Sequence, residues 1–324
     1  MRSSGTPGAA LTTLVAVVAL AGGCGGAAPR DTGVTPEAWG YPEHQFVVTT
    51  LSLPLSSADA TKFAFDLDGN GTLDNQMGML FVALKGQMGE TTPQSSVRAA
   101  IGDGRIIMLL SFYVQPDMQD SPVSNMWAFN GQRADPPLLN GPQPGGTFFV
   151  DPTAPQDLYC GGSITASLGR YGSDEATMLL RLPFGGGDGI LILPLTAVRV
   201  EFTAAAGGES LTEGRMGGAI RKQDVDDTLV PTVVDMLNEE MRAYCSASSG
   251  TCTCESGSGA ETIRQMFDTD GSCDVSPEEG RGNAIINALL EPDVTLSDGS
   301  GGVSVGFGFT AVNAVFDHLP PPTD

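Results

Sequence analysis

Residues 190–202 read ILILPLTAVRVEF, a stretch with the pattern of a half-buried β-strand. Val198, Val200 and Phe202 alternate with polar residues, so apolar and polar side chains would point to opposite faces of a sheet. Other short β-branched or aromatic runs, bounded by Gly, Pro, Asp and Ser, are FVVTTLSLPL (46–55), RIIMLLSFYV (105–114), TFFVD (147–151) and TMLLRLPF (177–184). We therefore predict a β-rich, sandwich-like body over residues 45–214.

The pattern becomes helical after Gly214. In QDVDDTLVPTVVDMLNEEMRAY (223–244) the apolar residues that recur at three- and four-residue steps are Val230, Val233, Leu237, Met241 and Tyr244. Beyond a cysteine-containing loop we expect a helix–loop–helix segment at 260–291 and a final strand, where apolar and small residues alternate at 303–309. The predicted fold class is α+β, with residues 215–318 forming an α/β segment after the β-rich body.

The N-terminus has the organisation of a secretory signal peptide. Arg2 precedes an apolar stretch from Ala9 to Ala21, and Gly22 and Gly23 come before Cys24. This stretch is too short for a membrane-spanning helix, which needs about 20 residues. The sequence LAGGC at 20–24 resembles the lipobox of bacterial lipoproteins, although Ala21 stands where Leu is usual. We predict a signal peptide at 1–23 and lipidation of Cys24, with plain cleavage as the alternative.

The residues after Cys24 indicate where such a protein would be located. Residues 24–44 are rich in Gly, Ala and Pro, which is typical of a flexible tether, and residues 319–324 form a short tail. Gly25 stands where an Asp would act as the inner-membrane retention signal in well-studied lipoproteins. We therefore expect the protein at the outer membrane or the cell surface.

The charge of the chain limits its partners. Residues 1–23 contain one of the 16 Lys and Arg residues and none of the 38 Asp and Glu residues, so the cleaved chain would have 15 cations, 38 acids and a formal charge of −23. Such a chain repels nucleic acid and anionic lipid and attracts cations. We expect no nucleic-acid partner, membrane attachment only through the lipid on Cys24, and a protein or polysaccharide partner that the sequence does not identify.

Five cysteines remain after the predicted lipid anchor: Cys160, Cys245, Cys252, Cys254 and Cys273. Disulfides are the default in an oxidising exported compartment, although an odd number leaves one cysteine without a partner among the five. Cys252 and Cys254 are too close in sequence to pair comfortably with each other. The alternative, a zinc site, needs clustered ligands, and the two histidines, His44 and His318, lie far away in sequence.

The segment DTDGSCDVSPEE at 268–279, here called loop II, has the ligand spacing of a calcium loop. Calcium takes six to eight oxygens, which a twelve-residue loop supplies from positions 1, 3, 5, 7, 9 and 12. The residues at these positions are Asp268, Asp270, Ser272, Asp274 (through its backbone carbonyl), Ser276 and Glu279. The segment resembles an EF-hand between the helices ETIRQMF and PEEGRGNAIINALL. The alternative is an Asp-rich turn that caps a helix without a metal.

Cys273 occupies the sixth position of loop II, where an EF-hand normally has Gly. A non-Gly residue at positive φ costs about 1–3 kcal/mol and persists only where its surroundings impose it. A disulfide from Cys273 to Cys252 or to Cys254 would impose that conformation.

A second oxygen-rich stretch, DLDGNGTLD at 66–74, is here called loop I. Its candidate metal ligands are Asp66, Asp68, Asn70, Thr72 and Asp74. Gly71 stands correctly at the sixth position, but the twelfth is Met77, so any last ligand must come from elsewhere. The pattern resembles the calcium loops of dockerin and of thrombospondin type 3 repeats. The alternative is an Asx-turn between a strand and a helix.

Together, the lipobox and the two loops resemble an uncharacterised group of predicted lipoproteins in GC-rich Gram-negative bacteria, a resemblance that implies no activity. The chain contains no GxSxG nucleophile elbow, since its GVSVG at 302–306 falls within the expected final strand, and it contains no HExxH motif, which argues against those catalytic classes. We predict a calcium-binding, lipid-anchored exported protein that acts as a structural or binding module without catalytic activity. The alternative is a secreted hydrolase that uses distant carboxylates, as glycosidases do, and has structural calcium.

Overall fold

The computed structural model describes residues 40–85, 93–134, 136–153, 158–183, 189–248 and 251–317. The predicted signal peptide, Cys24, residues 25–39 of the tether and the tail at 319–324 lie outside these ranges. The last residues of the predicted tether are described, and they correct its boundary. A strand already begins at Glu43, so His44 is part of the folded body.

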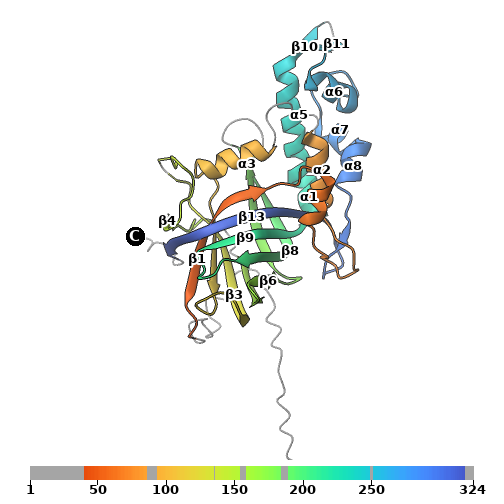
Figure 1. Ribbon diagram of the computed structural model, residues 1–324. Helices are drawn as coiled ribbons and strands as arrows, with labels where there is room; N and C mark the ends of the chain where they lie inside the picture. Colours follow the sequence, from red (N-terminus) through yellow and green to blue (C-terminus); the bar gives the residue numbers. More distant parts are fainter. Residues whose placement is uncertain are drawn as a thin grey trace, which may run out of the picture.

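Eleven strands of the described residues form one sheet, shown in Figure 1. These are β1 (Glu43–Ser52), β2 (Met108–Tyr113), β3 (Ser121–Asn130), β4 (Gly146–Phe149), β5 (Leu158–Thr165), β6 (Leu168–Gly172), β7 (Thr177–Pro183), β8 (Ile190–Ala204), β9 (Ser210–Arg221), β12 (Val294–Thr295) and β13 (Gly301–Asp317). A separate hairpin consists of β10 (Cys245–Ser248) and β11 (Thr251–Cys254).

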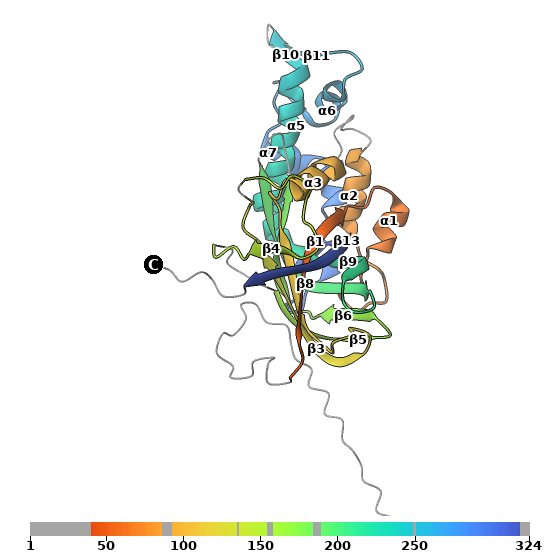
Figure 2. The same ribbon diagram turned by 60° about the vertical axis from the view of Figure 1, so that its left-hand side comes forward.

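The helices are short and lie between strands or beyond the ends of the sheet. They are α1 (Ser57–Lys62), α2 (Gln76–Lys85), α3 (Pro93–Gly102), α4 (Lys222–Asp224), the π-helix η2 (Val225–Leu229), α5 (Val230–Tyr244), α6 (Gly259–Phe267), α7 (Pro277–Gly282) and α8 (Ala284–Leu289). In both views α5 leads away from the sheet to the β10–β11 hairpin, with α6 alongside (Figures 1 and 2). No helix in the described ranges is long and apolar enough to span a membrane.

The sheet closes on itself. Its strands follow the order β1-β2-β3-β5-β6-β8-β9-β13, and β13 pairs with β1 again, every one of these pairs being antiparallel. The short strands β4, β7 and β12 pair with members of this ring. The C-terminal strand therefore lies between β9 and β1, where it closes the sheet (Figure 1).

Large apolar side chains fill the interior of the closed sheet. Val198, Val200 and Phe202 of β8 are at most 1% exposed, as their alternation predicts. Phe112 packs against Phe202 and Tyr171, with ring centroids 4.9 and 5.3 Å apart. Opposite walls of the ring thus pack face to face, which confirms the β-rich, sandwich-like body.

The helix after β9 contains a wide turn next to a proline. Pro231 near the start of α5 has no N–H group, and its ring crowds the carbonyl four residues earlier. The π-helix η2 precedes it and provides that wider turn. The predicted apolar face is buried at Val230, Val233, Leu237 and Met241, but Tyr244 at the end of α5 is 43% exposed.

The predicted α+β fold class, with a helical EF-hand segment after the body, is wrong, because one sheet of eleven strands dominates the described residues. β9 crosses residue 214, and β13 is a central strand, so the sheet takes strands from both predicted segments. The expected leaving helix is interrupted at Asn283, whose backbone is extended and whose side chain accepts a hydrogen bond from the Ile286 N–H at 3.2 Å. Gly280 and Gly282 also disfavour one continuous helix, since glycine costs about 1 kcal/mol relative to alanine within a helix.

Candidate metal sites

Loop I connects α1 to α2 and brings three carboxylates together. Oxygens of Asp66, Asp68 and Asp74 lie within 4.8 Å of one another. Backbone N–H groups shape the turn: the Gly71 N–H donates to Asp66 at 3.0 Å and the Asn70 N–H to Asp68 at 3.1 Å. Gly71 has φ of +84°, which an L-residue rarely adopts. The stretch therefore folds as a tight loop around its acids.

The charge at loop I is only partly compensated. Burial raises the pKa of Asp74, a hydrogen bond from the Leu67 N–H opposes this, and the nearby Asp293, Asp68 and Asp66 raise the pKa further. The Oδ1 atom of Asp66 is buried and has no hydrogen-bond partner in the described part of the chain. A carboxylate oxygen in that position is poorly solvated unless a cation binds it.

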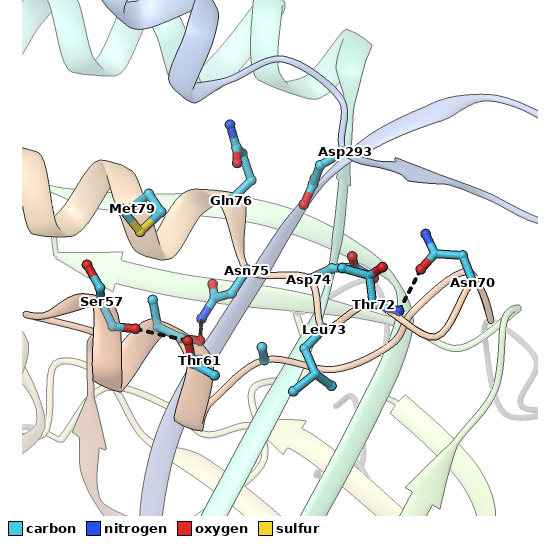
Figure 3. Close-up of a pocket in the computed structure, with 12 residues that line it drawn as sticks. Ser57, Thr61, Asn70, Thr72, Leu73, Asp74, Asn75, Gln76, Met79 and Asp293 are labelled. Carbon is cyan, nitrogen blue, oxygen red and sulfur yellow. Dashed lines mark hydrogen bonds between the residues drawn. The ribbon is translucent and has the colours of Figure 1, made fainter.

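A hollow of about 390 Å³ adjoins loop I (Figure 3). Asn70, Thr72 and Asp74 reach it from the loop, and Asp293 reaches it from the segment before β12. Asp293 accepts hydrogen bonds from the Ser304 N–H, at 2.8 Å, and from the Ser304 hydroxyl. Asp293 is thus an acid near loop I that sequence reasoning missed, because it lies more than 200 residues away along the chain.

The twelfth position of loop I supplies no ligand. Met77 stands there and is fully buried in the core. The Thr72 N–H donates to the Asn70 side chain at 2.7 Å, which fixes that amide within the loop. Of the five predicted residues of loop I, Asp66, Asp68 and Asp74 converge, while Asn70 and Thr72 line the adjoining hollow.

Loop II also brings three acids together, although its helices are short. Oxygens of Asp268, Asp270 and Glu279 lie within 4.8 Å of one another. Asp268 is 8% exposed and accepts hydrogen bonds from the N–H groups of Ser272, at 3.0 Å, and Cys273, at 3.1 Å. The carboxylates are thus oriented by the backbone of their own loop.

Three other predicted ligands of loop II take part in hydrogen bonds within the loop itself. The Ser272 hydroxyl donates to the Asp274 carbonyl at 2.8 Å, and the Asp274 carboxylate lies 3.5 Å from Arg242. Ser276 caps α7, where its hydroxyl accepts from the Glu279 N–H at 3.1 Å. Asp268, Asp270 and Glu279 thus form the acidic cluster, while the Ser272 hydroxyl, the Asp274 carbonyl and the Ser276 hydroxyl make hydrogen bonds within the same loop.

Hydrogen bonds keep Glu279 ionised. Partial burial acts to raise the pKa of Glu279, but bonds from the Ser276 N–H and from the hydroxyl and N–H of Thr269 lower it to about 2. A carboxylate that accepts several N–H and O–H bonds is stabilised in its charged form. Glu279 is therefore a permanent negative charge at loop II at neutral pH.

The disulfides answer the pairing question left open by the sequence. Cys273 pairs with Cys252 and has φ of +67°, and Cys245 pairs with Cys254 across the hairpin. Cys160 is fully buried in β5 and is not free. Sulfur atoms held in disulfides are not the thiolates that zinc requires, which argues against the zinc alternative in this state.

A buried asparagine on α5 holds loop II in place. The Asn238 amide donates to the Val275 carbonyl at 2.9 Å, and its oxygen accepts from the Val275 N–H at 2.7 Å. The Asn238 side chain thus satisfies both backbone groups of Val275, as a neighbouring β-strand would. Sequence reasoning missed Asn238, but one signal was present: it lies four residues after Val234 and three before Met241, on the apolar face of the helix.

No family model, curated protein or solved structure matches this chain. The two loops are therefore interpreted from their own chemistry. Clustered carboxylate oxygens suit a hard divalent cation, and each loop offers three carboxylates with further oxygen atoms nearby. Such a cation would neutralise the repulsion between the acids and cross-link the ends of each loop.

Proposed function

We propose that this chain is a calcium-binding, lipid-anchored exported protein that acts as a structural or binding module. The convergence of three carboxylates in each of the two loops supports the proposal most directly. Backbone N–H groups orient these acids in both loops, while Arg242 pairs with Asp274 at the edge of loop II.

The local chemistry favours calcium over a transition metal. The candidate ligands are all oxygens, which hard cations prefer, and the loops differ in composition and shape, which the flexible coordination of calcium tolerates better than the octahedral coordination of magnesium does. Residues Asp66, Asp68 and Asp74 would bind the ion in loop I, and Asp268, Asp270 and Glu279 in loop II. Extracellular calcium sites have dissociation constants of about 10⁻⁴–10⁻³ M. Ions bound in this range are permanent parts of a structure and not signals, so both ions would be structural.

The alternative, a carboxylate-based hydrolase, has one observation in its favour. Asp74 and Asp293 both line the hollow beside loop I. A general acid or base needs a carboxylate oxygen that can exchange a proton with a substrate. Both oxygens of Asp293 accept hydrogen bonds from Ser304, and Asp74 accepts one from the Leu67 N–H. These hydrogen bonds favour a structural role for Asp74 and Asp293 over a catalytic one.

The calcium proposal predicts two sites that can be removed one at a time. Calorimetry on the oxidised protein should give two calcium ions per chain, and one in Asp66→Asn and in Asp270→Asn. The described contacts give each of these carboxylates one N–H donor, so Asn can keep that hydrogen bond while removing the charge. At a calcium concentration 100-fold above Kd, each site should raise the free energy of unfolding by about 2.7 kcal/mol.

The matched control for calcium binding is Glu175→Gln. Glu175 is an exposed acid in the turn between β6 and β7, far from both loops in the sequence. If calcium acted only through the overall negative charge, this control would weaken binding as much as the loop variants do. A stoichiometry of two in both loop variants, or no calcium-dependent stabilisation of the unaltered protein, would contradict the proposal.

The anchor is tested by Cys24→Ser in a Gram-negative host. Because the lipid is attached through the sulfur of that cysteine, the variant should move from the membrane fraction to the soluble fraction, and mass spectrometry of the N-terminal peptide should show no lipid. Gly25→Asp is the matched control: it should keep the lipid and shift the protein toward the inner membrane. Retention of Cys24→Ser in the membrane fraction would show that the protein is held there by something else.

A further inference from the structure

Four cysteines meet where the β10–β11 hairpin contacts loop II. We call Cys245–Cys254 the outer pair and Cys252–Cys273 the inner pair. The sulfur atoms of Cys245, Cys252 and Cys254 all lie within 4.8 Å of one another, so the outer pair lies next to one sulfur of the inner pair. This proximity follows from the strand register: Cys245 faces Cys254, and Cys252 lies two residues from Cys254, on the same face.

The two pairs differ in accessibility. Cys252 is 4% exposed, whereas both members of the outer pair are partly exposed at the hairpin. Cys273, the other member of the inner pair, is also partly exposed. A reductant in solvent can therefore attack either the outer pair or the Cys273 sulfur of the inner pair. Thiol–disulfide exchange requires a thiolate to reach a disulfide sulfur, and here the outer pair would supply a thiolate already beside Cys252.

We propose that the outer pair is the exchange route to the inner pair, so that a single two-electron reduction at the hairpin releases loop II. A dithiol reductant reduces the Cys245–Cys254 bond to two thiols and is itself oxidised to a disulfide. The thiolate of Cys245, which lies within 4.8 Å of the Cys252 sulfur, then attacks that sulfur. A new S–S bond forms there, the Cys252–Cys273 bond breaks, and Cys273 leaves as a thiolate, with no net change in oxidation state.

Release of Cys273 removes the covalent constraint on the strained position of loop II. Its φ of +67° is unfavourable for a non-Gly residue, and its N–H group donates to Asp268 at 3.1 Å. Relaxation of this residue would disturb the orientation of Asp268 within the acidic cluster. A loss of calcium affinity at loop II therefore rests on the proposed function, whereas the exchange chemistry does not.

The first test follows thiols in the full oxidised chain. The protein is treated with one equivalent of dithiothreitol, quenched with acid at intervals and alkylated, and its peptides are mapped by mass spectrometry. Alkylation should appear first at Cys245 and Cys254; as it then appears at Cys273 it should fall at Cys245, which is by then in a disulfide with Cys252. Joint appearance of Cys252 and Cys273 as thiols, with the outer disulfide intact, would overturn the proposal.

The second test uses variants and needs no calcium. In Cys254→Ser the free Cys245 thiol should release Cys273 without any reductant, whereas an intact Cys252–Cys273 disulfide in that variant would overturn the proposal. In the double variant Cys245→Ser/Cys254→Ser the inner pair should be reduced about tenfold more slowly than in the unaltered protein. An unchanged rate there would also overturn it. Calcium binding to the oxidised unaltered protein tests the proposed function separately.

Discussion

Replacement of Asn75 by alanine is expected to lower the free energy of unfolding by about 3–5 kcal/mol, because each buried polar group left unpaired costs about 1–3 kcal/mol. Asn75 is 8% exposed and its side chain makes four hydrogen bonds. Its amide donates to the carbonyls of Ala60 and Gly306, and its oxygen accepts from the N–H groups of Gly78 and Gly306. One side chain therefore joins α1, α2 and the closing strand β13.

Gly306 explains why a side chain can take this place. β1 pairs with β13 only as far as Gly308, so on that side of β13 the Asn75 side chain, in place of β1, bonds to the N–H and carbonyl of Gly306. A Cβ atom at Gly306 would lie 2.2 Å from the carbonyl oxygen of Phe63, so only glycine fits there. Urea unfolding at fixed pH measures the effect. Asn140→Ala, at an exposed asparagine, should change stability by less than about 0.5 kcal/mol. A loss below that value in Asn75→Ala would disprove the bridging role.

The second large effect is expected for Asn238→Ala, at about 2–4 kcal/mol, since it leaves the buried N–H and carbonyl of Val275 without their partner. Val275 is 1% exposed and Asn238 is 4% exposed, so water cannot easily replace the lost amide. The variant should also weaken calcium binding at loop II and leave loop I unaffected. Urea unfolding and calorimetry measure the two consequences independently.

Asp235→Ala provides the control on the same helix. Asp235 is exposed on α5, so its replacement should change stability by less than about 0.5 kcal/mol. Asn238→Asp adds a finer comparison, because it keeps an acceptor for the Val275 N–H but loses the donor to the carbonyl. Its stability should therefore lie between those of the unaltered protein and Asn238→Ala. Equal stability of Asn238→Ala and Asp235→Ala would show that the amide does not support loop II.

The sequence predicts those features that depend on local periodicity. Alternation at residues 198–202 predicts a strand because side chains on successive residues point to opposite faces, and the structure buries the expected members. The apolar spacing of residues 230–241 predicts α5 for the same kind of reason. The same spacing wrongly places Tyr244 on the buried face. By that point α5 has led away from the sheet (Figure 1), and little remains there to cover the Tyr244 ring.

The contacts that support the candidate metal sites depend on tertiary structure and were not predictable in this way. Asn75 contacts Gly306, 231 residues away, and Asn238 contacts Val275, 37 residues away. The EF-hand comparison predicted the acids of loop II, since their spacing is local. It failed for the leaving helix because Asn283 bonds to the Met266 carbonyl at 2.8 Å and caps α8, a role that spacing alone does not indicate.

Because β13 closes the ring, the sheet can be completed only after residues 301–317 have been synthesised. Thr49 and Thr310 bond to each other across the β1–β13 seam although they are 261 residues apart, and such distant pairings make folding slow. Until residues 301–317 have left the ribosome, β1 and β9 each lack their neighbour, and unpaired strand edges readily join other chains. A nascent chain thus stays open until more than 300 residues have been made. That delay suits the proposed export of an unfolded chain, and it makes a chain that stalls before residue 301 a source of aggregates.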